Sequence, residues 1–175
     1  VVSDTPFFTQ LIEGMQQQSR AANLDMVISH ISKEGDYHTQ IAEIKQDDVS
    51  GYIILATEML NDDYVLFENI DKPVVFLDSF FPYKDKDFVL INNAQGAFMA
   101  TQHLIDYGHR SIGYLQSSVY INNFNYRKQG FLGALAANNI TADKNMWLEV
   151  EPTLNGAYRD THRLLSKGIK KLPTA

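Results

Sequence analysis

The chain has 175 residues, 45% of them hydrophobic and 21% charged, which is the composition of an ordinary globular protein with room for one core. Its 15 basic and 21 acidic residues give a formal charge of −6 without a basic stripe, so this segment by itself is expected to bind DNA poorly. The lack of cysteine excludes disulfides and thiolate metal sites and fits a reducing cytoplasm, and no apolar run approaches the ~20 residues of a membrane span.

The first quarter of the sequence alternates between strand and helix patterns. VVSD, residues 1–4, has the pattern of a strand that is ending. Pro6 stands where the missing N–H of a first helical residue costs nothing, and apolar residues then recur at helical spacing, which predicts a helix over residues 5–23. LDMVISHI predicts a strand over residues 24–31, and a weaker periodic pattern predicts a helix over 37–46.

The next segment has three strand patterns and one helical pattern. GYIILA, residues 51–56, is a continuous apolar run of the kind buried on both faces of a parallel sheet. A helix is expected over residues 62–69. The apolar runs VVFLD (74–78) and DFVLI (87–91) predict two further strands.

The stretch from Asn92 to residue 115 has the clearest pattern in the chain. A short amide side chain at Asn92 or Asn93 can accept a hydrogen bond from the first free N–H groups of a helix. Apolar residues then keep helical spacing, and Gly108 suits the left-handed position that ends a helix. SIGYL, residues 111–115, predicts a buried strand and completes a β-α-β unit.

The last third continues the alternation. A polar loop is expected over residues 117–125, a helix over 126–138, the strand WLEV over 147–150 and a helix over 155–167. Strands that alternate with helices of about a dozen residues predict an α/β protein. Its sheets should be mostly parallel and doubly wound, with helices on both faces.

Several motifs follow one another in a recognisable order: PVVFLD at 73–78, Asn92-Asn93 before Gly96-Ala97, HLIDYGHRSIGYL at 103–115, and Arg127 three residues before Gly-Phe. In this combination the chain, from Val1 to Ala175, resembles the sensor domain of the lactose/purine repressor (LacI-type) family of bacterial transcription regulators. That domain is similar in turn to the periplasmic sugar-binding proteins. The resemblance implies a periplasmic-binding-protein-like architecture with two lobes.

The resemblance also implies a domain organisation. Residues 1–109 would supply most of the N-terminal lobe of the effector-binding domain, and residues 110–175 the first part of the C-terminal lobe. In the family the chain crosses back between the lobes. We therefore expect the later strands of both lobes, and an N-terminal DNA-binding head, to belong to parts of the native polypeptide outside these 175 residues.

Ligands of open parallel sheets collect at the carboxyl ends of the strands, where three candidate residues stand. Phe7 and Phe8 follow the first predicted strand, and adjacent rings can stack on a sugar or a base, although one of them could instead pack in the core. Asp78 ends the VVFLD strand, where a carboxylate can accept two hydroxyl hydrogen bonds, cap a helix or lie in a solvated loop. By resemblance, all three positions match ligand-contacting positions of family members.

Two further candidates lie beside the helix predicted after the polar loop. Arg127 offers five N–H donors in a fixed fork, and R127-K-Q-G-F reproduces the family's R-x-x-G-F motif, whose arginine is a recurrent effector contact. A surface salt bridge is the alternative role for Arg127. Asn123 is a companion candidate in the loop. The family usually has Asp-Asn where this chain has Asn92-Asn93, which favours a capping role for Asn92 and puts in doubt any interaction built on that Asp.

Catalysis finds no support in the sequence. The five histidines lack the spacing of a zinc site, and no G-x-S-x-G elbow, G-x-G-x-x-G loop or phosphate loop occurs. We therefore expect no enzyme activity, no metal and no cofactor.

The resemblance implies that the chain is the effector-sensing core of a cytoplasmic transcription regulator. A small ligand would enter between the lobes and allosterically change the binding of operator DNA by the absent helix-turn-helix head, in a homodimer without a membrane partner. A carboxylate, an arginine, an asparagine and aromatic rings favour a sugar or sugar derivative, with a nucleobase as the other candidate. The alternative function is a free-standing periplasmic-type sugar-binding protein of a transporter.

Overall fold

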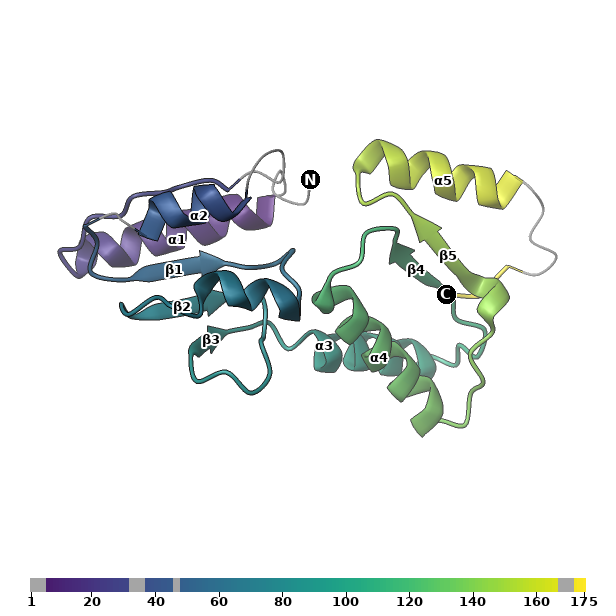
Figure 1. Ribbon diagram of the computed structural model, residues 1–175. Coiled ribbons are helices and arrows are strands. Elements are labelled where there is room, and N and C mark those ends of the chain that lie inside the picture. Colours follow the sequence, from purple (N-terminus) through teal and green to yellow (C-terminus); the bar gives the residue numbers. More distant parts are fainter. Residues whose placement is uncertain (1–5, 32–36, 46–47, 167–171) are drawn as a thin grey trace. The chain divides into compact units, whose positions relative to one another are not determined.

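The computed structural model describes residues 6–31, 37–45, 48–166 and 172–175 (Figure 1). The chain divides into two compact units. The first consists of Val1–Tyr52 together with Val65–Pro73, and the second of Ile53–Tyr64 together with Val74–Ala175. The strand predicted over residues 1–4 lies outside the described residues.

The first unit contains the helices α1 (Pro6–Ala21) and α2 (Tyr37–Lys45), close to their predicted bounds. Each helix buries one apolar face, as Phe8 on α1 and Ile41 on α2 show. The Tyr52 hydroxyl donates to the carbonyl of Ile44 on α2 at 3.2 Å. Leu66, Phe67 and Ile70, which follow in the second segment of this unit, are buried as well.

The strand predicted over residues 24–31 does not form. These residues are neither helix nor strand, and Leu24, Val27 and Ile28 are exposed. A strand is stabilised by ladder hydrogen bonds to a neighbour, and the described part of the chain provides no such bond to this segment. The apolar pattern of residues 24–31 alone was therefore not sufficient to predict a strand.

A three-stranded sheet orders β1 (Tyr52–Leu55), β2 (Val74–Leu77) and β3 (Asp87–Val89) side by side (Figure 1). β2 and β3 are parallel, with Phe76 opposite Phe88. β1 is parallel to β2. The backbone N–H of Tyr52 donates to the carbonyl of Pro73, and the N–H of Ala56 donates to the carbonyl of Leu77, so both strands advance in the same direction along the pair. The expectation that the strand GYIILA is buried on both faces is wrong, because Ile53 of β1 is 54% exposed.

A 3-10 helix, η1 (Asn61–Phe67), stands where a helix was predicted over 62–69. Backbone bonds from Asp63 N to Leu60 O and from Glu68 N to Val65 O span three residues, the spacing of a 3-10 helix. An aromatic core lies beside β2, where Phe76 and Phe81 are fully buried with ring centroids 5.1 Å apart. This core supports the end of β2, where Asp78 follows.

The remainder of the second unit alternates helices and strands, in the order α3 (Asn93–Asp106), β4 (Tyr114–Ser117), α4 (Asn122–Ala137), η2 (Lys144–Met146), β5 (Trp147–Val150) and α5 (Leu154–Ser166). β4 and β5 are parallel, with Tyr114 opposite Trp147. α3, β4 and α4 share one hydrophobic core, formed by Ile105, Ile112, Phe131, Ala134 and Leu135. The predicted α/β class with parallel strands is confirmed.

Both ends of α3 form as predicted. The Asn92 side chain caps its start, because Oδ1 accepts from the backbone N–H of Gln95 at 3.1 Å. Gly108 has a φ of 91°, and its N–H donates to the carbonyl of Ile105 at 2.9 Å, as in a left-handed helix stop.

Two boundaries after α3 differ from the predicted ones. The strand predicted over 111–115 runs over Tyr114–Ser117, and α4 begins at Asn122 although a loop was predicted over 117–125. Ile121 stands at the N-cap of α4 without a side-chain cap bond, so the sequence carries no start signal there. The polar residues at the start of α4 therefore belong to a helix, which bears on the site.

Candidate functional site

Asp78 directly follows β2 and adopts a left-handed backbone, with a φ of 60°. Its backbone N–H donates to the carbonyl of Val89, 3.0 Å away on the neighbouring strand β3. Its carboxylate Oδ2 accepts from the hydroxyl of Thr57 at 2.8 Å, and both side chains are buried. Oδ1 forms no hydrogen bond with the residues that the structure describes, so this carboxylate keeps acceptor capacity.

Asn123 joins the start of α4 to the end of β2. Its Nδ2 donates to the backbone carbonyl of Asp78 at 3.1 Å, and only 5% of the residue is exposed. Both residues belong to the second unit. The shift of the helix start from residue 126 to Asn122 therefore places Asn123 on a rigid element instead of a loop.

Arg127 lies one helical turn after Asn123, on the same side of α4. Its Nε donates to Oδ1 of Asn93 at 2.6 Å. Its Cζ lies 5.5 Å from the centroid of the Phe124 ring, within cation–π range. Among the described residues no carboxylate pairs with Arg127, so the alternative role in a surface salt bridge is not what the structure shows.

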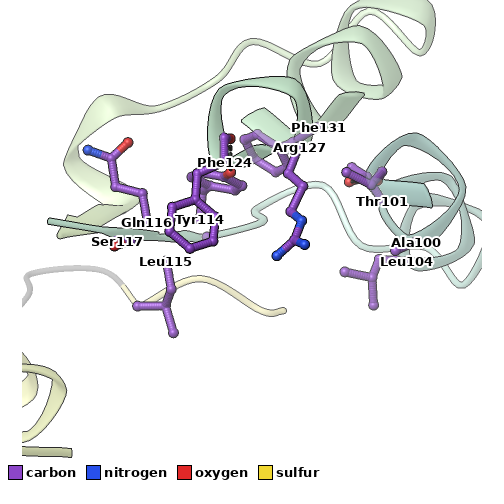
Figure 2. A pocket seen from close by; sticks show the side chains of 12 residues that line it. Ala100, Thr101, Leu104, Tyr114, Leu115, Gln116, Ser117, Phe124, Arg127 and Phe131 are labelled. Carbon is purple, nitrogen blue, oxygen red and sulfur yellow. Dashed lines mark hydrogen bonds between the residues drawn. The ribbon is translucent and has the colours of Figure 1, made fainter. Parts of the chain in front are cut away.

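A cavity of about 350 Å³ opens beside Arg127, between α3, β4 and α4 (Figure 2). Figure 2 shows the guanidinium reaching into it, between Leu115 of β4 and Leu104 of α3. Arg127 is the one charged side chain of its lining, which is otherwise apolar or neutral: Ala97, Ala100, Thr101, Leu104, Gly113, Tyr114, Leu115, Gln116, Ser117, Phe124 and Phe131. Such a cavity suits a small ligand that offers acceptor oxygens to the guanidinium.

Tyr114 stands in the cavity wall with its hydroxyl 3.5 Å from the carbonyl of Phe124. Burial raises the pKa of this phenol, while the positive charge of Arg127 opposes the rise. Tyr114 is therefore a neutral hydrogen-bonding group at physiological pH.

Phe7 and Phe8 belong to the first unit, so they remain a separate prediction from the residues above. Their rings meet edge to face, with centroids 5.2 Å apart. Phe8 is buried, which agrees with the core role weighed for one of the two. Phe7 is 41% exposed.

Two residues of the site were missed by the sequence reading. Thr57 follows β1, so the rule that ligand residues stand at strand ends could have found it. Asn93 was weighed only as a helix cap, and nothing in the sequence signals its contact with Arg127 on another helix.

The described residues show neither a candidate metal site nor a candidate membrane span. They contain no group of three or more side chains that could hold a metal ion. Within the same ranges, none of the helices has the length and hydropathy that a bilayer span requires.

Comparison with known families decides the kinship of the chain. Residues 2–175 match the family described as periplasmic binding proteins and sugar-binding domain of the LacI family. The chain belongs to this family. The LacI-type resemblance noted from the motifs is thereby confirmed.

Curated LacI-family relatives agree with this membership. The HTH-type transcriptional repressor PurR of Mannheimia succiniciproducens is 28% identical over 178 residues, which are 99% of this chain and 52% of the relative. The PurR of Photorhabdus laumondii is 30% identical over 185 residues, 99% of this chain and 51% of the relative. The chain thus spans about half the length of the curated relatives it matches.

Solved structures show the same fold. A transcriptional regulator from Yersinia pestis superposes with a TM-score of 0.84 at 20% identity, over 99% of this chain and 61% of that one. The regulator CelR in complex with cellobiose gives 0.77 at 22%, over 93% and 50%. A LacI-family regulator from Enterococcus faecium with bound ribose gives 0.75 at 25%, over 94% and 60%.

These comparisons bear on two expectations. The periplasmic-binding-protein-like fold is confirmed by the LacI-family neighbours. The expectation that the chain is not an enzyme agrees with the names of the relatives it matches, which are transcriptional repressors and regulators.

Proposed function

We propose that this chain is the effector-binding part of a bacterial transcription regulator of the LacI family. In this proposal a small ligand binds to Asp78, Asn123 and Arg127 and changes the affinity of the whole protein for operator DNA. The kinship supports the proposal, since the PurR relatives are named as helix-turn-helix repressors about twice as long as this chain. The DNA-binding head would lie in the remainder of the polypeptide.

The observation that carries the proposal is the arrangement along α4. Asn123 holds the end of β2, and Arg127 stands one turn further with its guanidinium in the cavity. Asp78 adds a carboxylate whose Oδ1 accepts no hydrogen bond from a described residue. An acceptor and a fork of donors on neighbouring rigid elements can bind the hydroxyl groups of one polar molecule.

A sugar or sugar derivative is the ligand class we propose. A carboxylate accepts from hydroxyl hydrogens while a guanidinium donates to hydroxyl oxygens, and sugars offer both on adjacent carbons. Solved relatives carry cellobiose and ribose. Phe7 and Phe8 of the first unit stay proposed ligand contacts by resemblance to the family, since an aromatic ring can stack on a sugar face. A nucleobase remains the second candidate.

The regulator would work as a two-state device. A ligand can change DNA affinity only through its different affinities for two arrangements of the effector-binding domain. We propose, with the family, a cytoplasmic homodimer whose two lobes enclose the ligand. Sedimentation of the full-length protein as a monomer at micromolar concentration would count against the dimer.

The predicted division into lobes near residue 109 is untested, and the packing of α3 favours an earlier boundary. α3 shares a hydrophobic core with β4 and α4, through Ile105, Ile112 and Phe131. We therefore propose that the C-terminal lobe includes α3 and begins near Asn92, where the chain leaves β3.

The free-standing sugar-binding protein remains the alternative, because the family description names periplasmic binding proteins as well. DNA binding separates the two functions. A regulator binds operator DNA and a transport protein does not, whereas both bind a small ligand.

A two-step experiment on the full-length protein tests the proposal. A thermal-shift screen with sugars, sugar derivatives and nucleobases comes first, since a ligand that binds the native state raises the melting temperature. DNA from the promoter region upstream of the protein's own gene is then titrated with and without that ligand. We expect a ligand-dependent change in DNA affinity. Ligand binding without any DNA binding would support the transport protein instead.

A further inference from the structure

The contact between Arg127 on α4 and Asn93 on α3 has a role beyond helix packing. We propose that Asn93 is the positioning residue of the ligand site: its amide oxygen takes the Nε–H of Arg127 and turns the two Nη groups of the guanidinium toward the cavity. The proposal rests on the function proposed above only where it assigns Arg127 to the ligand. The positioning itself can be measured without any ligand.

The side chain of Asn93 is held in one orientation, in which its amide oxygen can accept a hydrogen bond. It is 6% exposed, its backbone N–H donates to the carbonyl of Ile91 at 2.8 Å, and its Nδ2 donates to the same carbonyl at 3.2 Å. Because the amide nitrogen faces that carbonyl, the amide oxygen has to face the other way. Oδ1 is thereby aimed at Arg127, 2.6 Å from its Nε.

The crossing of α3 and α4 brings the two residues within reach. A Cβ placed on Gly130 of α4 would collide with the backbone carbonyl of Ala94 and would lie 3.0 Å from the backbone nitrogen of Phe98. The two helices therefore meet backbone to backbone at Gly130. Arg127 is one turn before Gly130, and Asn93 is the residue before Ala94, so a close crossing at the glycine places their side chains together. The R-x-x-G spacing thus has a physical meaning in this chain.

The contact decides which donors of Arg127 remain for a ligand. With Nε engaged, Nη1 and Nη2 form no hydrogen bond with the described residues and extend into the cavity (Figure 2). These two groups can hold two neighbouring acceptor oxygens end-on, in a parallel pair of hydrogen bonds. The ligand class this geometry favours carries such a pair, as vicinal hydroxyls or as a carboxylate. A side chain already held in place also loses less rotamer freedom when the ligand binds.

The test is the exchange rate of the Arg127 Nε–H with water, measured by NMR in the ligand-free full-length protein labelled with ¹⁵N-arginine. Arg20 is exposed on α1, and no hydrogen bond or ion pair of its side chain occurs among the described residues. It supplies the reference rate, and Arg127→Lys and Arg20→Lys assign the signals. We expect the Arg127 Nε–H to exchange at least tenfold more slowly than that of Arg20. In Asn93→Ala the Arg127 rate should rise to the reference.

Asn125→Ala is the matched control, since Asn125 lies on α4 two residues from Arg127 and its side chain has no hydrogen-bond partner among the described residues. It should leave the slow exchange unchanged. Equal rates for Arg127 and Arg20 in the unmodified protein would overturn the proposal, and so would slow exchange that persists in Asn93→Ala. Either result leaves the proposed function standing, whereas unaltered ligand binding by Arg127→Ala would remove that function without touching the exchange result.

Discussion

Asp78 is the residue on which the end of β2 depends. Its φ of 60° is a conformation that Asp and Asn tolerate better than most residues, and the conformation turns the chain out of the strand at the point where the site begins. Its buried carboxylate has one side-chain donor among the described residues, the hydroxyl of Thr57. Thr57 is therefore expected to stabilise the site through this one bond.

Replacing Thr57 with valine tests that role. Valine keeps the shape of threonine and removes the hydroxyl, which leaves the carboxylate of Asp78 without its donor. We expect Thr57→Val to lower the free energy of unfolding by about 1–3 kcal/mol, the usual cost of a buried polar group without a partner. Urea unfolding measures it, and Thr57→Ser, which keeps the hydroxyl, should lose clearly less. Equal losses in the two variants would show that the hydrogen bond does not matter.

At this scale the sequence pointed to Asp78 and Arg127, but it missed Thr57 after β1 and the contacts between distant elements. Asp78 and Arg127 follow from a strand end and a motif, because both signals are local. The bond between Asn93 and Arg127 joins residues 34 positions apart on two helices, and it depends on a crossing distance that no local pattern records. Asn92 illustrates the reverse case, since helix capping is local and its role was predicted correctly.

The pair formed by α3 and α4 is the element that positions the site. Gly130 allows the close crossing. At Gly133, one turn further along α4, an added Cβ would lie 3.6 Å from Cδ2 of the Phe98 ring, the nearest atom of another described element. Substitution of Gly130 therefore tests the backbone contact between the two helices, and substitution of Gly133 tests helix propensity in the same helix.

Alanine substitutions at the two glycines should change the stability of the protein in opposite directions. Gly130→Ala should destabilise the protein by about 1–3 kcal/mol or more, because the new methyl group overlaps the backbone of α3. Gly133→Ala should be neutral or stabilise it by up to ~1 kcal/mol, since alanine is the better helix former and the added methyl makes an ordinary contact. Urea unfolding of both variants provides the comparison. A neutral Gly130→Ala would mean that the helices can separate without cost.

The elements could be predicted to the extent that their signals are local. α1, α2, α3 and β5 have apolar periodicity or caps and lie close to their expected bounds. The start of α4 was missed because Ile121 offers no cap and polar residues fill the first turn. The segment 24–31 was misassigned because an apolar pattern becomes a strand only where a neighbour supplies ladder bonds.

At the scale of the whole molecule, the motifs were sufficient to identify the family, since their order along the chain is itself specific. The ligand cannot be identified in that way, because related sites differ by single side chains around one scaffold. The chemistry of this site narrows the choice of ligand: the carboxylate of Asp78 follows β2, and the buried amide of Asn123 and the guanidinium of Arg127 belong to α4. We propose that these groups bind a small ligand through Arg127.

Isothermal titration calorimetry on the full-length protein tests this claim most directly, with the ligand that gives the largest thermal shift. Arg127→Ala should weaken the affinity by roughly tenfold or more, about 1.4 kcal/mol or more. The variant should stay folded with a lower urea midpoint, because the buried Oδ1 of Asn93 loses its donor. Arg20→Ala, which removes an exposed arginine of the first unit, should bind as the unmodified protein does. An Arg127→Ala variant that binds the ligand with unchanged affinity would contradict the account.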